Sequence, residues 1–152
     1  MYDFKIILKL HPQMQVQIND FNQSNDIVRI IGNEITYNEL FEKSSLLITD
    51  YSSTAFDFAY LKKPIIYYQQ VPLDYELSDD VFNYENDGFG YATKDLNLVV
   101  DKIIEYMENG CEMEKMYQDR VDSFFAYRDQ NNSERVYQEI LKLPERTREE
   151  LI

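Results

Sequence analysis

Residues 46–68 read LLITDYSSTAFDFAYLKKPIIYY, and the fold of the chain follows from this stretch. It opens with a short apolar run, Leu46–Thr49, whose length and β-branched content predict a buried strand. A second apolar run, Ile65–Tyr68, predicts another buried strand. Between the two runs, a polar turn precedes apolar residues at helical spacing, and Pro64 marks the end of that helix. This order of strand, turn, helix and strand predicts two parallel strands of an α/β fold.

The polar turn holds the residues on which the functional interpretation depends. Asp50, Ser52, Ser53 and Thr54 have side chains that cap helices and hydrogen-bond to nearby backbone. Parallel α/β units bind ligands at the carboxyl ends of their strands, and the free amides at the start of a helix attract anions. The turn is therefore predicted to bind a phosphate group.

A first strand is predicted over Phe4–Leu10 and ends at His11 and Pro12. Proline stops a strand and keeps the residue before it away from helical backbone angles. In a parallel sheet, His11 then lies at the same edge as the polar turn, where an imidazole can donate to a phosphate oxygen or carry a proton. A lone histidine at a strand tip is also a common capping or solvent-facing residue, so its position leaves both interpretations open.

Shorter patterns predict three further elements before this stretch. A short helix is expected over Met14–Phe21 and a second strand over Ile27–Ile31. Thr36 and Glu39 have the spacing of a capping box, which predicts a helix over Tyr37–Lys43. That helix leads into the stretch quoted above.

Beyond the second strand of that stretch, an acidic segment over Gln69–Gly90 reads as a long loop, which is a common place for ligand contacts. Asp74–Glu76, Tyr84 with Glu85, and the turn Gly88–Gly90 are candidates to overhang a ligand. A solvated acidic face explains the same composition equally well.

The C-terminal part of the chain is predicted to be helical. One helix opens at Thr93–Leu96 and stops at Asn109 and Gly110, and a second covers Met113–Phe125. Ser133 is expected to cap a last helix. The buried stripe of that last helix is predicted to consist of Val136, Ile140 and Leu141.

Composition limits the classes of function. A length of 152 residues fits one domain with a sizeable core. The net charge of −13 argues against a nucleic-acid binder and against a broad patch for anionic membranes. The charge is uneven, because 14 of the 28 acidic residues lie between Asp74 and Asp122, and this distribution is compatible with a small phosphate site. One cysteine and one histidine exclude an internal disulfide and argue against zinc, and they favour a reducing, cytosolic setting. A magnesium site built from carboxylates stays open.

The motifs together resemble the CDP-glycerol glycerophosphotransferase family of teichoic acid biosynthesis. The resemblance lies in LKLHP at residues 8–12, YNEL at 37–40, the whole stretch 46–68, and FFAYRDQNNSER at 124–135. It extends over most of the chain and keeps the order of the motifs. The central stretch is specific, whereas each flanking motif alone is weak evidence.

The resemblance implies a Rossmann-like parallel sheet flanked by helices, as one half of the two-domain GT-B architecture. Residues 1–152 would form a single C-terminal domain that binds the CDP-activated donor. The N-terminal acceptor domain would be absent from this chain, so the polypeptide alone is expected to fold but not to turn over. No cofactor is implied, and CDP-glycerol would be the donor substrate.

The implied reaction transfers glycerol phosphate from CDP-glycerol to a teichoic acid-type polymer or a lipid-linked acceptor, with release of CMP. The full protein would be cytoplasmic and peripheral at the inner face of the cell membrane. His11 would be the catalytic residue, at the donor diphosphate. Ser52, Ser53, Ser133 and Arg135 would bind donor phosphate. Asp50 and Glu134 would orient the donor.

Three alternatives remain after the resemblance. The chain could belong to a relative that transfers ribitol phosphate, to a GT-B enzyme that uses a nucleotide sugar, or to a non-catalytic interaction module with the same fold. Sugar transferases of this fold typically have a Gly-rich turn where this chain has the serine turn, which favours the glycerophosphotransferase.

Overall fold

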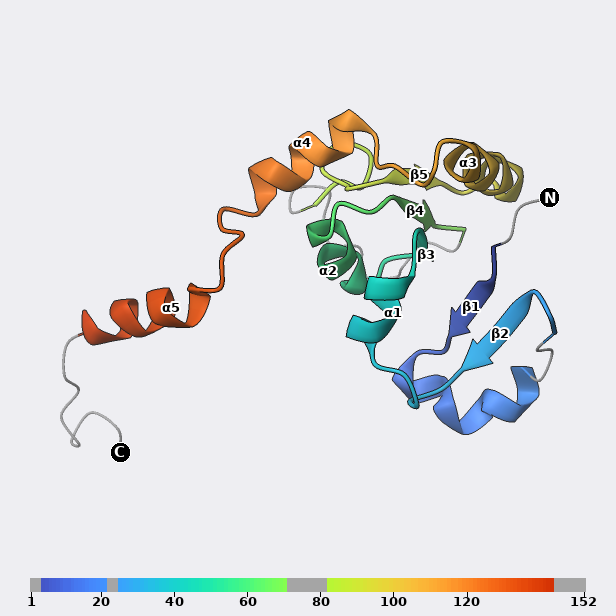
Figure 1. Ribbon diagram of the computed structural model, residues 1–152, viewed down its shortest axis with the longest axis horizontal. Coiled ribbons are helices and arrows are strands. Elements are labelled where there is room, and N and C mark those ends of the chain that lie inside the picture. Colours follow the sequence, from blue (N-terminus) through green and yellow to red (C-terminus); the bar gives the residue numbers. More distant parts are fainter. Residues whose placement is uncertain (1–3, 22–24, 71–81, 144–152) are drawn as a thin grey trace. The chain divides into compact units, whose positions relative to one another are not determined.

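The computed structural model describes residues 4–21, 25–70 and 82–143 (Figure 1). The chain divides into two compact units, residues 1–121 and 122–152, and each unit is described by itself. The elements, in chain order, are β1 (Ile6–Lys9), the 3-10 helix η1 (Pro12–Phe21), β2 (Val28–Ile31), α1 (Tyr37–Lys43), β3 (Leu47–Thr49), α2 (Thr54–Tyr60), β4 (Ile65–Tyr68), β5 (Tyr91–Thr93), α3 (Leu96–Glu108), α4 (Lys115–Phe124) and α5 (Asn132–Leu141).

All strand pairs among the described residues are parallel. β1 pairs with β2, with Ile6 opposite Val28. A second sheet has the order β3-β4-β5, with Thr49 opposite Tyr67 on one side of β4 and Tyr68 opposite Thr93 on the other. Helices connect and flank these strands (Figure 1), which confirms the α/β class with Rossmann-like parallel strands.

Helix α1 begins and ends where its local sequence predicts. The Oγ1 atom of Thr36 accepts from the backbone N–H of Glu39 at 3.3 Å, and Glu39 Oε2 accepts from the N–H of Thr36 at 2.9 Å, so the capping box is complete. At the other end, Lys63 Nζ donates to three backbone carbonyl oxygens, those of Phe41, Glu42 and Ser44, at 2.7–2.9 Å. This lysine ties the start of β4 to the last turn of α1.

Strand β4 lies in the core with both faces covered. Ile66 packs with Val99 and Tyr106 of α3 on one face. Strand alternation places Ile65 and Tyr67 on the opposite face, and both are at most 1% exposed. Burial on both faces explains why this strand reads as an uninterrupted apolar run.

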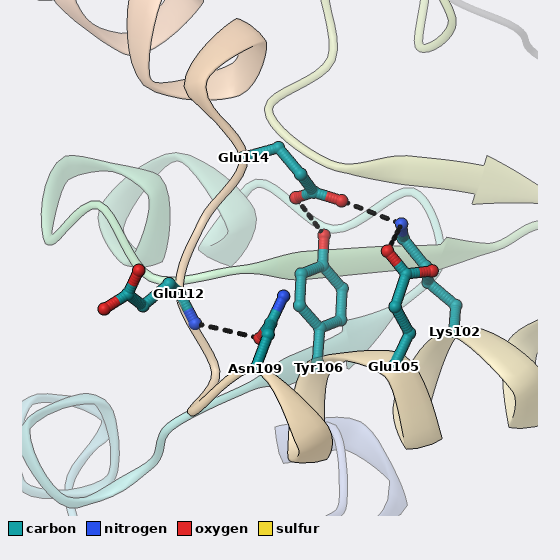
Figure 2. Close-up of polar contacts among 6 residues, drawn as sticks. All are labelled: Lys102, Glu105, Tyr106, Asn109, Glu112 and Glu114. Carbon is teal, nitrogen blue, oxygen red and sulfur yellow. Dashed lines mark hydrogen bonds and ion pairs between the residues drawn. The ribbon is translucent and has the colours of Figure 1, made fainter.

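A polar network closes the connection from α3 to α4 (Figure 2). The hydroxyl group of Tyr106 donates to Glu114 Oε2 at 2.5 Å, and Lys102 Nζ lies 2.8 Å from Glu114 Oε1. Lys102 also bonds to Glu105 Oε1 at 2.9 Å. The tyrosine is fully buried, so this network gives its hydroxyl the acceptor that burial demands.

Several predictions need correction in detail. β3 is only half buried, with Ile48 46% exposed, so the prediction of a buried strand was wrong for this residue. The short helix predicted over Met14–Phe21 is present as a 3-10 helix, and it begins two residues earlier, at Pro12. Strand β5 was not predicted, because its residues follow the predicted loop and overlap the predicted start of the next helix. The N-cap of α3 is Asp95, whose Oδ1 accepts from the N–H of Asn97 at 2.8 Å.

The last helix differs most from its prediction. Its N-cap is Asn131, so Ser133 lies inside the first turn of α5 and does not cap it. The stripe predicted to be buried is exposed in the described structure, with Val136 at 59%, Ile140 at 56% and Leu141 at 59%. Periodicity identified the apolar side of the helix correctly, but it does not show whether a neighbour covers that side.

Candidate functional site

The serine turn connects the carboxyl end of β3 to the start of α2. Ser52 Oγ lies 2.8 Å from Thr54 Oγ1 and accepts from the backbone N–H of Thr54 at 3.3 Å. The carbonyl oxygen of Ser52 accepts from the N–H of Ala55 at 3.2 Å. Ser52 therefore organises the turn through its side chain and its backbone.

Ser53 and Asp50 present their side chains differently. Ser53 is the N-cap residue of α2, yet its side chain makes no cap hydrogen bond, because its backbone is already helical with φ −63° and ψ −17°. Capping side chains reach the first amides from extended backbone instead. Ser53 and Asp50 are both exposed, so both side chains are accessible to a ligand at this edge of the sheet.

Aromatic rings form a wall beside the turn. The ring of Tyr51 meets that of Tyr84 edge-on with centroids 5.6 Å apart, and Tyr84 also packs on Tyr67 at 5.0 Å and on Phe82 at 5.2 Å. Burial raises the pKa of Tyr84, and the neighbouring Tyr51 and Asp50 raise it further. The Tyr84 phenol therefore stays protonated near neutral pH and remains a hydrogen-bond donor beside the turn.

The aromatic wall contains one of the residues predicted to overhang a ligand. Tyr84, predicted to overhang a ligand, contacts the serine turn through Tyr51. Another predicted overhang, Asp74–Glu76, lies outside the described residues. The sequence has 13 tyrosines, and which of them meet at the turn depends on the tertiary fold.

Gln69 is a residue at this edge that the sequence did not single out. It follows β4 directly, is 9% exposed, and its backbone N–H donates to the carbonyl oxygen of Thr93 at 2.9 Å. No motif surrounds it, and one of two adjacent glutamines in a polar segment gives no signal of burial.

His11 stands exposed at the tip that follows β1. Its Nδ1 atom accepts from the backbone N–H of Gln13 at 3.3 Å, and its carbonyl oxygen accepts from the N–H of Met14 at 2.8 Å. Because Nδ1 accepts a hydrogen bond, the proton of the neutral imidazole is on Nε2. The Nε2–H group is then a donor directed away from the backbone of this turn. This tautomer suits a contact to a phosphate oxygen.

Ser133, Glu134 and Arg135 lie in the first turn of α5, in the second unit. The guanidinium of Arg135 bonds Asp129 through both carboxylate oxygens, at 2.9 and 2.5 Å, and stacks 3.7 Å above the ring centroid of Tyr127. Arg135 lowers the pKa of Asp129 by these bonds. A phosphate at Arg135 would therefore compete with, or join, an existing carboxylate partner.

Other features of the described residues do not add to this site. A pocket of about 510 Å³ lies between α1 and α2, lined by residues that include Asn38, Asp57 and Lys63. Lys63 precedes β4, so this pocket lies toward the amino end of that strand, opposite the edge that ligands use in parallel sheets. No group of three metal-binding side chains occurs in residues 4–21, 25–70 and 82–143.

Comparison with known proteins identifies the family. Residues 2–142 match the family model described as CDP-Glycerol:Poly(glycerophosphate) glycerophosphotransferase. The chain belongs to this family. The resemblance inferred from the sequence motifs is thereby confirmed.

Relatives within the glycerophosphotransferase family act in teichoic acid synthesis, as their names state. The chain is 46% identical over 141 residues to the minor teichoic acid biosynthesis protein GgaB of Bacillus subtilis. The match covers 93% of this chain and 15% of GgaB. It is 38% identical over 66 residues to a teichoic acid glycerol-phosphate primase of the same organism, covering 43% of this chain and 17% of the primase. It is 31% identical over 143 residues to a teichoic acid poly(ribitol-phosphate) polymerase of Bacillus spizizenii, covering 91% of this chain and 22% of the polymerase.

The matched parts of the chain thus span between 15% and 22% of the length of these three relatives. No solved structure matches it. Among the helices in the described parts of the chain, none combines the length and the apolar character that a membrane span requires.

Proposed function

We propose that this chain is the donor-binding domain of a transferase that moves glycerol phosphate from CDP-glycerol to a teichoic acid-type polymer or lipid-linked acceptor. The observation that carries this proposal is the serine turn at the carboxyl end of β3, in a member of the glycerophosphotransferase family. Parallel α/β folds bind nucleotides at this edge. The names of the relatives support a product of the teichoic acid type.

In the proposed reaction, an acceptor hydroxyl oxygen attacks the β-phosphorus of CDP-glycerol. A new phosphorus–oxygen bond forms, the bond to the bridging oxygen breaks, and CMP leaves with that oxygen, while the proton of the acceptor hydroxyl passes to solvent. Such a transfer depends mainly on positioning and on donors that stabilise charge on the phosphate oxygens. His11, through Nε2, is the proposed catalytic donor at the diphosphate.

Six further polar residues are assigned to the donor in this proposal. Ser53 and Ser52 bind phosphate oxygens at the turn, while the exposed carboxylate of Asp50 orients the glycerol hydroxyls. Ser133 and Arg135 bind phosphate at the start of α5, and Glu134 orients the donor there. These assignments use charge-assisted and hydroxyl hydrogen bonds, which suit phosphate oxygens.

His11 and the serine turn can act together if β1 lies beside β3. Each of these strands ends its sheet among the described residues, and each exposes apolar side chains, with Ile6 57%, Ile7 43% and Ile48 46% exposed. Parallel strands in α/β proteins are normally covered on both faces. Pairing β1 with β3 would create the order β2-β1-β3-β4-β5, whose switch point lies between His11 and the turn.

The domain assignment also implies partners. An acceptor domain on the same protein would complete the cleft, and the full protein would work at the inner face of the cell membrane, where a lipid-linked acceptor is available. The isolated chain is then expected to bind donor without turnover. Incubation with CDP-glycerol and acceptor should release no CMP from this chain alone.

Calorimetric titration with CDP-glycerol and CDP tests the donor site. His11→Ala, and Ser52→Ala combined with Ser53→Ala, should each weaken binding by roughly 1.5 to 3 kcal/mol, because each removes donors to a charged group. Ser45→Ala serves as the control, since Ser45 is exposed and lies before β3. Unchanged affinity in both site variants would contradict the site, and a wild-type chain that binds neither ligand would contradict donor binding by this chain.

The same titration separates the alternatives. Relatives named for glycerol phosphate and for ribitol phosphate both match the chain, so CDP-ribitol belongs beside CDP-glycerol. Tighter binding of CDP-ribitol would assign the ribitol donor. Binding of a UDP-sugar alone would assign a sugar transferase, and no binding of any nucleotide would favour an interaction module.

A further inference from the structure

Gln69 carries a buried hydrogen-bond donor that the described chain does not use. The residue is 9% exposed, and its Nε2 atom is buried with no hydrogen-bond partner in residues 4–21, 25–70 and 82–143. An amide that is buried without a partner costs free energy, so native proteins keep few of them. Such a group calls for an acceptor that is present in the working protein.

The position of Gln69 points to a ligand as that acceptor. Thr49 lies opposite Tyr67, so Asp50 of the serine turn and Gln69 both follow the carboxyl ends of neighbouring parallel strands. Alternation along β4 places Gln69 on the same face as Tyr67, whose ring packs on Tyr84. Tyr84 in turn contacts Tyr51 of the turn. Gln69 therefore belongs to the same edge as the proposed phosphate site.

We propose that Gln69 is a donor-binding residue whose Nε2 donates a hydrogen bond to an oxygen atom of the nucleoside-diphosphate ester bound at this edge. The inference rests on the proposed function and adds a residue to its site. A neutral amide can donate to a phosphate oxygen or to a polyol hydroxyl, and both belong to the same ligand. The hydrogen bond forms only when ligand is bound, so ligand-free protein carries the cost of the unpaired amide.

Gln69→Met and Gln70→Met form a matched pair of variants. Methionine has nearly the length of glutamine but no donor, and Gln70 is the exposed neighbour of the same residue type. Titrations with CDP-glycerol and with CDP give the affinities, and thermal unfolding of the ligand-free protein gives the stability. Gln69→Met should bind about tenfold more weakly, with a melting temperature equal to or above that of the wild type. Gln70→Met should change neither quantity.

The ligand arms locate the acceptor oxygen. An equal loss of affinity for CDP-glycerol and CDP assigns the contact to the nucleoside diphosphate, whereas a loss for CDP-glycerol alone assigns it to the glycerol. Gln69→Glu provides a second variant of the same shape, in which an acceptor replaces the donor. If the contact is to phosphate, Gln69→Glu must also lose affinity for CDP. This expectation holds even if Gln69→Met lowers the melting temperature.

Three outcomes overturn the inference. Wild-type affinity in Gln69→Met and Gln69→Glu would show that Gln69 is a structural residue, while leaving the donor site at the serine turn intact. Equal losses in the Gln69 and Gln70 variants would show a general effect of the segment. A wild-type chain that binds neither CDP-glycerol nor CDP would overturn the proposed function, and this inference with it.

Discussion

Glu114 keeps its negative charge in a partly buried position because two donors reach it. Burial by itself raises the pKa of this carboxyl, but hydrogen bonds from Lys102 and Tyr106 outweigh that effect, and the pKa lies below its ordinary value of 4.5 (Figure 2). The ionised carboxylate is therefore more favourable in the folded protein than in the unfolded chain. Its contribution to stability is complete above the ordinary pKa and is lost as the pH falls through the lower folded value.

Glu114→Gln should lower the free energy of unfolding at pH 7 by about 1–3 kcal/mol, because a neutral amide replaces the acceptor of two hydrogen bonds. The difference from the wild type should shrink as the pH falls below the ordinary carboxyl pKa of 4.5 and through the lower folded value, where the wild-type carboxyl takes up its proton. Urea unfolding at a series of pH values measures both effects.

Glu112→Gln is the matched control for that series. Glu112 is exposed, its carboxylate points away from the network in Figure 2, and the contact to Asn109 Oδ1 comes from its backbone N–H at 3.4 Å. Its stability should follow the wild type at every pH. A pH-independent loss in Glu114→Gln would show that the carboxyl is not stabilised as an ion.

Residue-scale prediction from sequence succeeded where contacts are local and missed long-range partners. Thr36 and Glu39 meet within one helical turn, and their capping box formed as predicted. Tyr106 is fully buried, and the sequence did not single it out, because its polar hydroxyl needs Glu114, which is eight residues away. The local sequence pattern around Tyr106 does not predict that Glu114 accepts its hydrogen bond.

At the scale of elements, Gly90 decides whether β5 can pair with β4. A Cβ atom at this position would lie 2.1 Å from the carbonyl oxygen of Ile65, so a side chain cannot fit without moving the backbone. Glycine is therefore required by close approach of two strands. A three-residue strand is too short to show alternation, which explains why the sequence did not predict β5.

Gly90→Ala should destabilise the first unit by about 3 kcal/mol, as expected for overpacking against backbone. Gly110→Ala is the comparison, because Gly110 has open space around its Cβ position but a φ of +77°. That change should cost about 1 kcal/mol, the price of left-handed backbone for alanine. Denaturant unfolding measures both, and an equal loss in the two variants would contradict the close approach of β5.

At the scale of the whole molecule, the apolar face of α5 in the second unit is exposed. Val136, Ile140 and Leu141 are each more than half exposed, and no residue of α5 is buried in the described structure. The apolar side chains of α5 therefore contribute little buried area to the described structure.

A chain that ends at Phe125 should therefore melt within about 4 °C of the full chain, a shift that corresponds to no more than about 1 kcal/mol. Val121→Ala provides the contrast, because Val121 is fully buried in α4 and its truncation should cost about 2 kcal/mol. Thermal unfolding followed by circular dichroism compares the three proteins. A fall well beyond 4 °C in the shortened chain would contradict the exposure of the α5 side chains.

The sequence by itself determined the family, the parallel α/β class and the helices whose caps lie within a few residues. Motif order, apolar runs and capping boxes are properties of neighbouring residues, so they are readable without coordinates. Only the tertiary structure decided that Tyr84 meets the serine turn and that the side-chain amide of Gln69 is buried with no hydrogen-bond partner among the described residues. Each of these depends on which surfaces the folded chain brings together, because burial and pairing are set by neighbours in space rather than by neighbours in sequence.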